Sequence, residues 1–169
     1  MTRRLRGERF PAEGLAPLEA ERLVRAPVEL VWELLSDLRA MGERSPETVR
    51  MIITRSPRVG SRGLNVNRRG PVVWPTTTRV TRWKPPSHDG SAALAFHVGP
   101  TAVEWSYELN GVDGGTRVVE RRTGIASPTT IVRHASRWFM GGAQSHDVEL
   151  LDGMHRTLAA LAAEAESRA

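Results

Sequence analysis

The chain contains no cysteine among its 169 residues, which excludes disulfide bonds, thiolate-bound metals, iron–sulfur clusters and a cysteine nucleophile. No segment reaches the roughly 18 uncharged apolar residues that a membrane-spanning helix needs. Arg3 and Arg4 are similar to the start of a twin-arginine export signal, but no hydrophobic segment follows them. We therefore expect a cytoplasmic protein without integral membrane association.

Motifs of several enzyme and cofactor classes are also missing. The sequence has no G-x-G-x-x-G, no P-loop and no G-x-S-x-G nucleophile elbow. Its five histidines are scattered, and no group of His, Asp and Glu has convincing ligand spacing. We expect neither a metal ion nor a cofactor.

Lysine is almost absent, because Lys84 is the only lysine among 24 basic residues. The 19 acidic residues leave a net charge of +5. Such an excess raises the question of a phosphate-binding face for nucleic acid. The arginines do not form one block in the sequence, which favours a solvated surface, so we expect no nucleic-acid partner. The sequence leaves open whether the protein is a monomer or a homodimer.

The order of predicted elements indicates one α+β domain. Residues 1–17 lack a clear periodicity and are expected to form a loose arm before a single domain over 18–169. The expected elements are a strand over 18–25, a helix opened by Pro27, a short second helix over 38–44, short strands over 47–122 and a long helix over 143–167.

The middle of the chain predicts an antiparallel sheet of six to seven strands. Turn residues recur at intervals too short for the helical crossovers that parallel strands require. In three runs of residues, successive side chains alternate between two faces, as they do in the strands of a half-buried sheet. Their inward residues are predicted to be Trp74, Thr76, Thr78 and Val80, then Leu94, Phe96 and Val98, then Trp105, Tyr107 and Leu109.

The long last helix carries one apolar stripe that includes Leu151, Met154 and Leu158. A twisted antiparallel sheet curved around a single helix need not fill its interior. This order of elements therefore predicts an internal cavity between the helix and the concave face of the sheet.

Several short motifs occur in an order that is fairly specific. They are Ala26-Pro27, Val31-Trp32, Ser36-Asp37, Ser45-Pro46, Val59-Gly60, Asn67-Arg68, Trp74 with Thr76 and Val80, Trp105 with Tyr107, Gly115-Thr116 through Val118 to Glu120, Gly153-Met154 and Thr157-Leu158. This order resembles the SRPBCC superfamily, which includes START, Bet v1 and polyketide cyclase/dehydrase domains. It is most similar to the bacterial branch of polyketide cyclases and lipid-transport proteins. The resemblance implies a helix-grip fold and a hydrophobic small-molecule ligand.

Glu120 and Tyr107 are the first candidates for catalysis. Glu120 shares a strand face with Val118, so it points into the cavity if Val118 faces the helix. A carboxylate in an apolar cavity has a raised pKa and can act as a general acid or base. The alternative is a structural ion pair with Arg122 or Arg133. Tyr107, the only tyrosine, lies on an apolar face, where its hydroxyl needs Glu120 or a ligand as partner.

Residues 124–142 are predicted to form a loop or broken helix that closes over the cavity. This segment contains His134, a third candidate for proton transfer whose alternative is an ordinary surface histidine. Asn67 is expected either to donate to a ligand oxygen or to satisfy the turn over 68–71. The predicted ligand-binding residues are Asn67, Trp74, Thr76, Phe96, Trp105, Trp138 and Met154.

Three classes of function remain open at this point. The cavity suits a cyclase or aromatase that holds a flexible poly-carbonyl chain and moves protons on it. It equally suits a carrier or sensor that binds a lipid or other small molecule unchanged. A module that contacts protein or RNA through its arginine surface is the third class.

Overall fold

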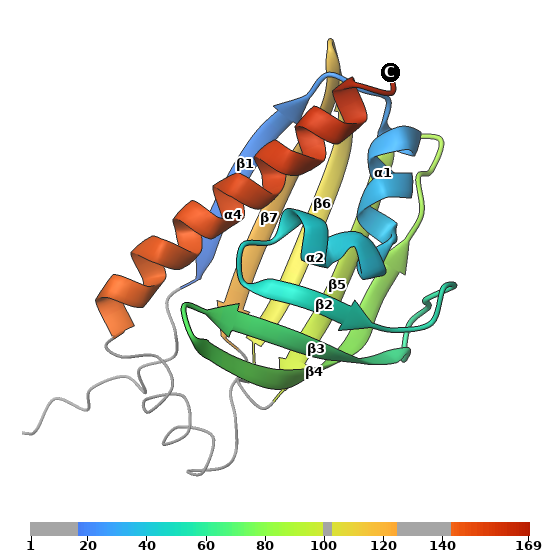
Figure 1. Ribbon diagram of the computed structural model, residues 1–169. Coiled ribbons are helices and arrows are strands. Elements are labelled where there is room, and N and C mark those ends of the chain that lie inside the picture. Colours follow the sequence, from blue (N-terminus) through green and yellow to red (C-terminus); the bar gives the residue numbers. More distant parts are fainter. Residues whose placement is uncertain (1–16, 100–102, 125–142) are drawn as a thin grey trace, which may run out of the picture.

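The computed structural model describes residues 17–99, 103–124 and 143–169, with the side chains of the last range from residue 148 onward. Its core element is a curved sheet with helices on the concave side (Figure 1). The elements are β1 (Leu18–Val24), α1 (Val28–Ser36), the 3-10 turn η1 (Leu38–Ala40), α2 (Met41–Arg44), β2 (Thr48–Ile52), β3 (Arg62–Arg69), β4 (Val72–Lys84), β5 (Ser91–Gly99), β6 (Val103–Val112), β7 (Gly115–Gly124) and α4 (Ala143–Glu166).

The sheet has seven strands in the order β1-β7-β6-β5-β4-β3-β2, and every neighbouring pair is antiparallel. Strands β2 to β7 form a meander, and β1 joins it by pairing with β7. Helix α4 packs mainly against β1 and also contacts α1 and α2 (Figure 1). The predicted α+β helix-grip fold with an antiparallel sheet is confirmed.

Local sequence signals explain where the first helices begin and end. The carbonyl of Pro27 accepts the amide of Val31 at 3.1 Å, so Pro27 is the N-cap of α1. The carboxylate of Asp37 accepts the amide of Arg39 at 3.2 Å and begins the 3-10 turn. Helix α2 ends at Arg44, two residues before Pro46, because a residue preceding proline disfavours helical backbone.

Gly115 fixes β7 against the bend that follows β1. Its φ is 149°, and a Cβ at this position would lie 2.1 Å from the carbonyl oxygen of Val24. The hydroxyl of the next residue, Thr116, donates to the carbonyl of Ala26 at 2.8 Å. These contacts attach the start of the helical segment to the last strand, which holds Glu120.

The hydrophobic core lies between α1, the sheet and the C-terminal half of α4. Its most buried side chains include Val31, Leu35, Leu94, Leu109, Val118, Leu158 and Leu161. Met154 and Leu158 are buried and Leu151 packs against this core, so the predicted apolar stripe of α4 faces the sheet. The part of α4 before Met154 lies beside an open space.

Candidate functional site

A cavity of about 460 Å³ lies between the concave face of the sheet, the segment joining α2 to β2, and the first half of α4. Volumes of roughly 300–1,000 Å³ are typical of small-molecule sites. The cavity has a polar wall on β2, β3 and β4, an aromatic wall on β5 and β6, and a carboxyl group on β7.

The carboxyl group belongs to Glu120, whose side chain is 2% exposed. Tyr107 lies directly opposite on β6 and donates its hydroxyl to Oε1 of Glu120 at 2.8 Å. The other oxygen, Oε2, is buried and has no hydrogen-bond partner among the described residues. A buried oxygen without a partner is costly unless it meets a ligand or is protonated.

Burial raises the pKa of Glu120 from 4.5 to about 8, and the hydrogen bond from Tyr107 opposes this shift only in part. Glu120 is therefore mostly a neutral carboxylic acid at pH 7. Burial raises the pKa of Tyr107 well above its usual value of 10.0, and the charge of Glu120 raises it further. Tyr107 therefore stays a neutral donor to Oε1, and Oε2 is the carboxyl oxygen that can carry the proton of the neutral acid.

The polar wall is a network of amide and hydroxyl groups on β2, β3 and β4. Asn65 donates to the hydroxyls of Thr78 at 2.7 Å and Thr76 at 3.1 Å. Asn67 donates to the hydroxyl of Thr76 at 3.0 Å. The hydroxyl of Thr48 donates to the Asn67 carbonyl oxygen at 3.2 Å. The polar groups of this wall are thus largely hydrogen-bonded to one another.

One interpretation of Asn67 is wrong. The side chain does not satisfy the turn over 68–71, because its amide donates to Thr76 and, at 3.4 Å, to the carbonyl of Trp74. Both partners lie on β4, beyond the turn, because the β3–β4 register places Asn67 opposite Trp74.

The aromatic wall supplies apolar area. The rings of Phe96 and Tyr107 are 6.5 Å apart and tilted by 32°. Trp105 and Trp74 are half-buried and line the same cavity, and Met154 of α4 lines it too. Trp105 is therefore part of a cavity wall as well as a neighbour of the core. Aromatic rings in this arrangement favour planar, apolar ligands.

The structure brings eight of the predicted site residues together around this cavity. They are Asn67, Trp74, Thr76, Phe96, Trp105, Tyr107, Glu120 and Met154. Their functional roles remain predictions. His134 and Trp138 lie outside the described residues, as does the predicted closing segment beyond Gly124.

Sequence reasoning missed Arg122 as a cavity residue. Its side chain is 2% exposed and lines the cavity two residues beyond Glu120. The signal was present, since alternate residues of a strand share a face and Val118 already indicated the inward one. Within the described part of the chain, no ion pair joins Glu120 to Arg122, and Arg133 lies outside that part.

The rim of the cavity is tied across by two contacts. Arg69, at the end of β3, forms an ion pair with Glu149 of α4. Pro46 lies against Gly153, where a Cβ would be only 3.3 Å from the proline ring. Gly153 thus allows close packing in a continuous helix, and the hairpin of β3 and β4 is held near α4.

Residues 17–99, 103–124 and 143–169 contain neither a metal-binding cluster nor a membrane-spanning helix. No three His, Asp or Glu side chains in these ranges are grouped so that they could hold a metal ion. No helix there is both long and apolar enough to cross a bilayer.

A sheet that grips a long helix around a lined cavity defines a helix-grip domain of the SRPBCC type. Residues 16–166 match the model of the family described as polyketide cyclase / dehydrase and lipid transport. The chain belongs to this family, which confirms the resemblance inferred from the sequence. A search of curated proteins found no significant match.

Solved structures share the fold at low sequence identity. The di-domain ARO/CYC StfQ from the steffimycin biosynthetic pathway is 15% identical with a TM-score of 0.69, over 90% of this chain and 51% of that one. The Zhui aromatase/cyclase from Streptomyces sp. R1128 is 18% identical with a TM-score of 0.62, over 90% and 94%. A STAR-related lipid transfer protein from Xanthomonas axonopodis is 11% identical with a TM-score of 0.64, over 94% and 90%. The chain spans about half the length of StfQ, and these likenesses show the fold alone.

Proposed function

We propose that the cavity binds a mainly apolar, planar, polyketide-like molecule with ketone oxygens, and that Glu120 moves protons on it as in a cyclase or aromatase. The observation that carries this proposal is that Glu120 lines the cavity while its Oε2 atom is buried and has no hydrogen-bond partner among the described residues. A ligand carbonyl is the kind of group that a neutral carboxylic acid at this position would bind.

The proposed reaction balances without an external reactant. The carboxylate of Glu120 takes a proton from a carbon beside a ketone, which breaks a C–H bond and forms an enolate. The enolate carbon attacks a second carbonyl of the same chain, forming a C–C bond and an alkoxide. The carboxylic acid of Glu120 then returns its proton to the alkoxide. A pKa near the working pH suits one group to both transfers.

Three features of the cavity support this chemistry. Tyr107 holds one carboxyl oxygen, so the other keeps a fixed direction. The aromatic wall gives a flexible chain a flat surface on which to fold, which brings the reacting carbons together. Because Glu120 is buried, water competes less for the reacting oxygens, and each hydrogen bond to them is stronger.

A carrier of lipids or other small molecules is the second candidate. The observation that favours it is the network of Asn65, Asn67, Thr76 and Thr78, whose amide and hydroxyl groups are largely paired with one another. Such a wall does not require hydrogen bonds from a ligand, so an unreactive apolar molecule would fit it. The family description names lipid transport as well.

Ligand binding in the cavity is tested by the Trp105→Ala variant. We expect the wild-type protein to bind methyl naphthyl ketone, and the variant to bind it about tenfold more weakly because one aromatic contact surface is lost. The measurement is saturation-transfer NMR with competition by unlabelled ketone.

The matched control is Trp83→Ala. Trp83 is also a partly buried tryptophan on a strand, but it packs on Trp32 with ring centroids 5.3 Å apart and does not line the cavity. Equal binding by all three proteins, or no binding by the wild type, would overturn the assignment of this cavity as the ligand site.

A further inference from the structure

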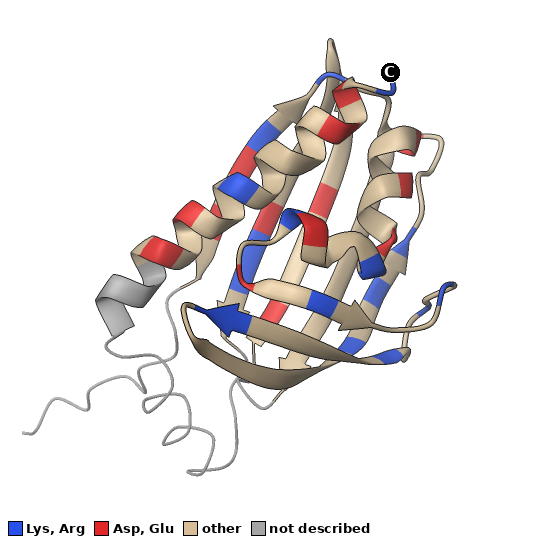
Figure 2. Cartoon of the chain, viewed as in Figure 1, with Lys and Arg blue, Asp and Glu red and all other residues tan. Residues whose placement is uncertain are grey.

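The outer face of β2, β3 and β4 has a different composition from the rest of the sheet. Residues 48–84 contain nine basic residues and no acidic residue. The basic residues are Arg50, Arg55, Arg58, Arg62, Arg68, Arg69, Arg79, Arg82 and Lys84. Figure 2 shows blue segments and no red on these three strands. Although the arginines are separated in the sequence, the fold gathers them on one part of the molecule.

Strand register shows how the outer face is built. Ile52 lies beside Leu64, and Arg50 lies beside Val66 in the next row. Val66 in turn lies opposite Pro75, while Arg68 lies opposite Val73 and Arg62 opposite Arg79. The alternate residues, such as Asn65 and Thr76, are buried, so these rows point outward. The result is an aliphatic centre with arginines around it, which we call the β2–β4 outer face.

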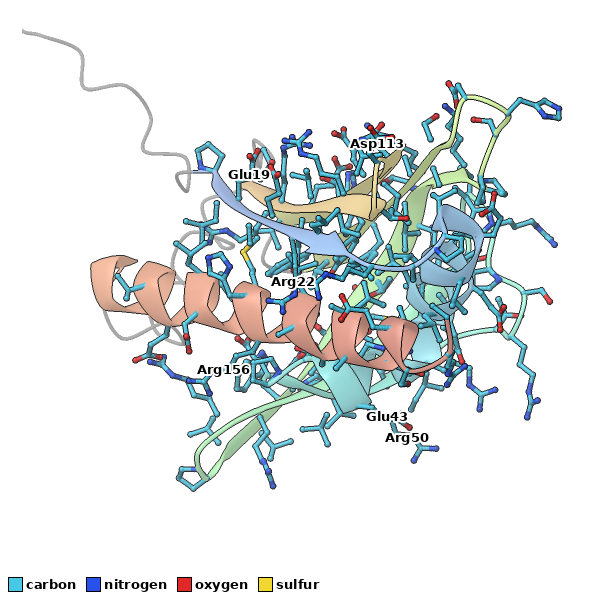
Figure 3. The ribbon with its side chains drawn as sticks, turned by 90° about the horizontal axis from the view of Figure 1, so that it is seen from above. Glu19, Arg22, Glu43, Arg50, Asp113 and Arg156 are labelled. Atoms are coloured by element: carbon cyan, nitrogen blue, oxygen red, sulfur yellow. The ribbon has the colours of Figure 1, made fainter. Side chains whose placement is uncertain are left out.

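The aliphatic centre is exposed to an unusual degree. Ile52 is 49% exposed, Leu64 43% and Val73 60%. A contiguous apolar patch with a polar rim is typical of an interaction surface. Figure 3 shows Arg50 pointing away from the ribbon, on the side opposite Asp113.

Few basic side chains of this face meet a carboxylate among the residues that the structure describes. Within the described residues, Arg50, Arg62, Arg68 and Arg79 form no ion pair. Of the nine basic residues, only Arg69 and Arg82 have carboxylate partners there, Glu149 and, at 3.9 Å, Glu108. The positive charge of the face is therefore available to an anionic partner.

We propose that the β2–β4 outer face docks on the surface of an anionic lipid bilayer. Arginines attract anionic headgroups, and exposed aliphatic side chains can enter the region between headgroups and acyl chains. Nucleic acid would use the charge but would leave Ile52, Leu64 and Val73 in water. This mode of binding is peripheral, and it does not depend on the chemistry of Glu120.

The position of this face relates it to the cavity. Arg68 is exposed on the outer face, beside Val73, and it also lines the rim of the cavity with Arg69 and Gly70 of the same β3–β4 hairpin. Docking therefore places the rim of the cavity next to the bilayer, where an apolar ligand would be dissolved. Docking on the bilayer thus gives the cavity a source for its ligand without defining the reaction.

The test is co-flotation of the full chain with vesicles of phosphatidylcholine, alone or mixed with phosphatidylglycerol. We expect binding to the mixed vesicles only, decreasing as salt rises. The variant Arg50→Gln with Arg68→Gln should bind about 25-fold more weakly, from about fivefold per arginine near the surface. The variant Ile52→Ser with Leu64→Ser should also lose most of its binding, because it lacks the apolar side chains that would enter the bilayer.

The matched control is Arg22→Gln with Leu23→Ser on β1, where Leu23 has the same 49% exposure as Ile52. It should bind like the wild type, and circular dichroism melts should show all variants folded. Three results would overturn the proposal: no flotation of the wild type with anionic vesicles, an equal loss in the control, or no effect of Ile52→Ser with Leu64→Ser. Binding to a labelled RNA or DNA duplex in place of anionic vesicles would identify nucleic acid as the occupant and would also overturn it.

Discussion

Replacing Glu120 with glutamine is expected to lower proton exchange on a bound ketone by about 10²-fold. Glutamine keeps the size of the side chain and can accept the hydrogen bond from Tyr107, but it neither takes nor returns a proton. The measurement is deuterium uptake at the methyl group of methyl naphthyl ketone in heavy water, followed by mass spectrometry. Affinity for the ketone should change little, so the loss should appear in turnover.

The pH dependence gives this prediction a second readout. Because the carboxylate is the base, exchange by the wild type should rise with pH and reach half its maximum near pH 8, the pKa of Glu120. Glu108→Gln is the control, since Glu108 lies on β6 and pairs with Arg121 outside the cavity. A carrier would show wild-type binding without protein-dependent exchange, and exchange that survives in Glu120→Gln would exclude Glu120 as the base.

The same substitution should change stability in a pH-dependent way. In the folded protein Glu120 holds its proton up to a pKa of about 8, whereas in the unfolded chain its ordinary pKa is 4.5. The folded state therefore binds more protons between these values, and the free energy of unfolding falls as pH rises through them. The full difference is roughly 5 kcal/mol, at about 1.4 kcal/mol per pH unit.

The Glu120→Gln variant has no carboxyl group at this position, so no proton titrates there. It should match the wild type at about pH 5 and be more stable by several kcal/mol at about pH 9, as measured by urea unfolding at each pH. Titrating groups that do not interact with Glu120 affect both proteins equally, so the difference between them reports on Glu120 and its partner Tyr107. A structural ion pair at Glu120 predicts the opposite sign, because the wild type would then be more stable at neutral and alkaline pH.

The fold was predictable because its signals are local. Alternating residues such as Trp105 and Tyr107 indicate a strand face, and the stripe of Met154 and Leu158 indicates a helix face. Frequent turn residues exclude parallel crossovers. The pairing of β1 with β7 is not local, so it could not be read from the sequence pattern. The close approach of Gly115 to Val24 depends on that pairing and is visible only in three dimensions.

The candidate site was predictable where strand alternation is regular. Strand β7 is regular, so the inward position of Glu120 followed from Val118, and Arg122 follows from the same rule. Strand β2 is short and its register shifts between Thr48 and Arg50, which breaks the alternation. Its contributions to the cavity, Thr48 and Met51, could therefore not be assigned from a period of two.

The pairing of polar groups was not predictable. Which hydroxyl Asn67 would meet depends on the exact register of β3 with β4, and a shift of one residue would turn the side chain outward. The β2–β4 outer face has the same origin, since register brings Arg50 and Arg68 beside Val66 and Val73. Sequence spacing alone describes these arginines as scattered.

At physiological pH Glu120 is expected to be a neutral carboxylic acid in the cavity, and its titration can be observed directly. The measurement is a carbon-13 NMR titration of the glutamate side-chain carboxyls, with the Glu120 signal assigned by its loss in Glu120→Gln. Tyr107→Phe should move the midpoint higher, because the hydrogen bond that lowers the pKa is removed. We predict a midpoint near pH 8 in the wild-type protein, whereas a midpoint near the ordinary 4.5 would show that Glu120 is a carboxylate at pH 7.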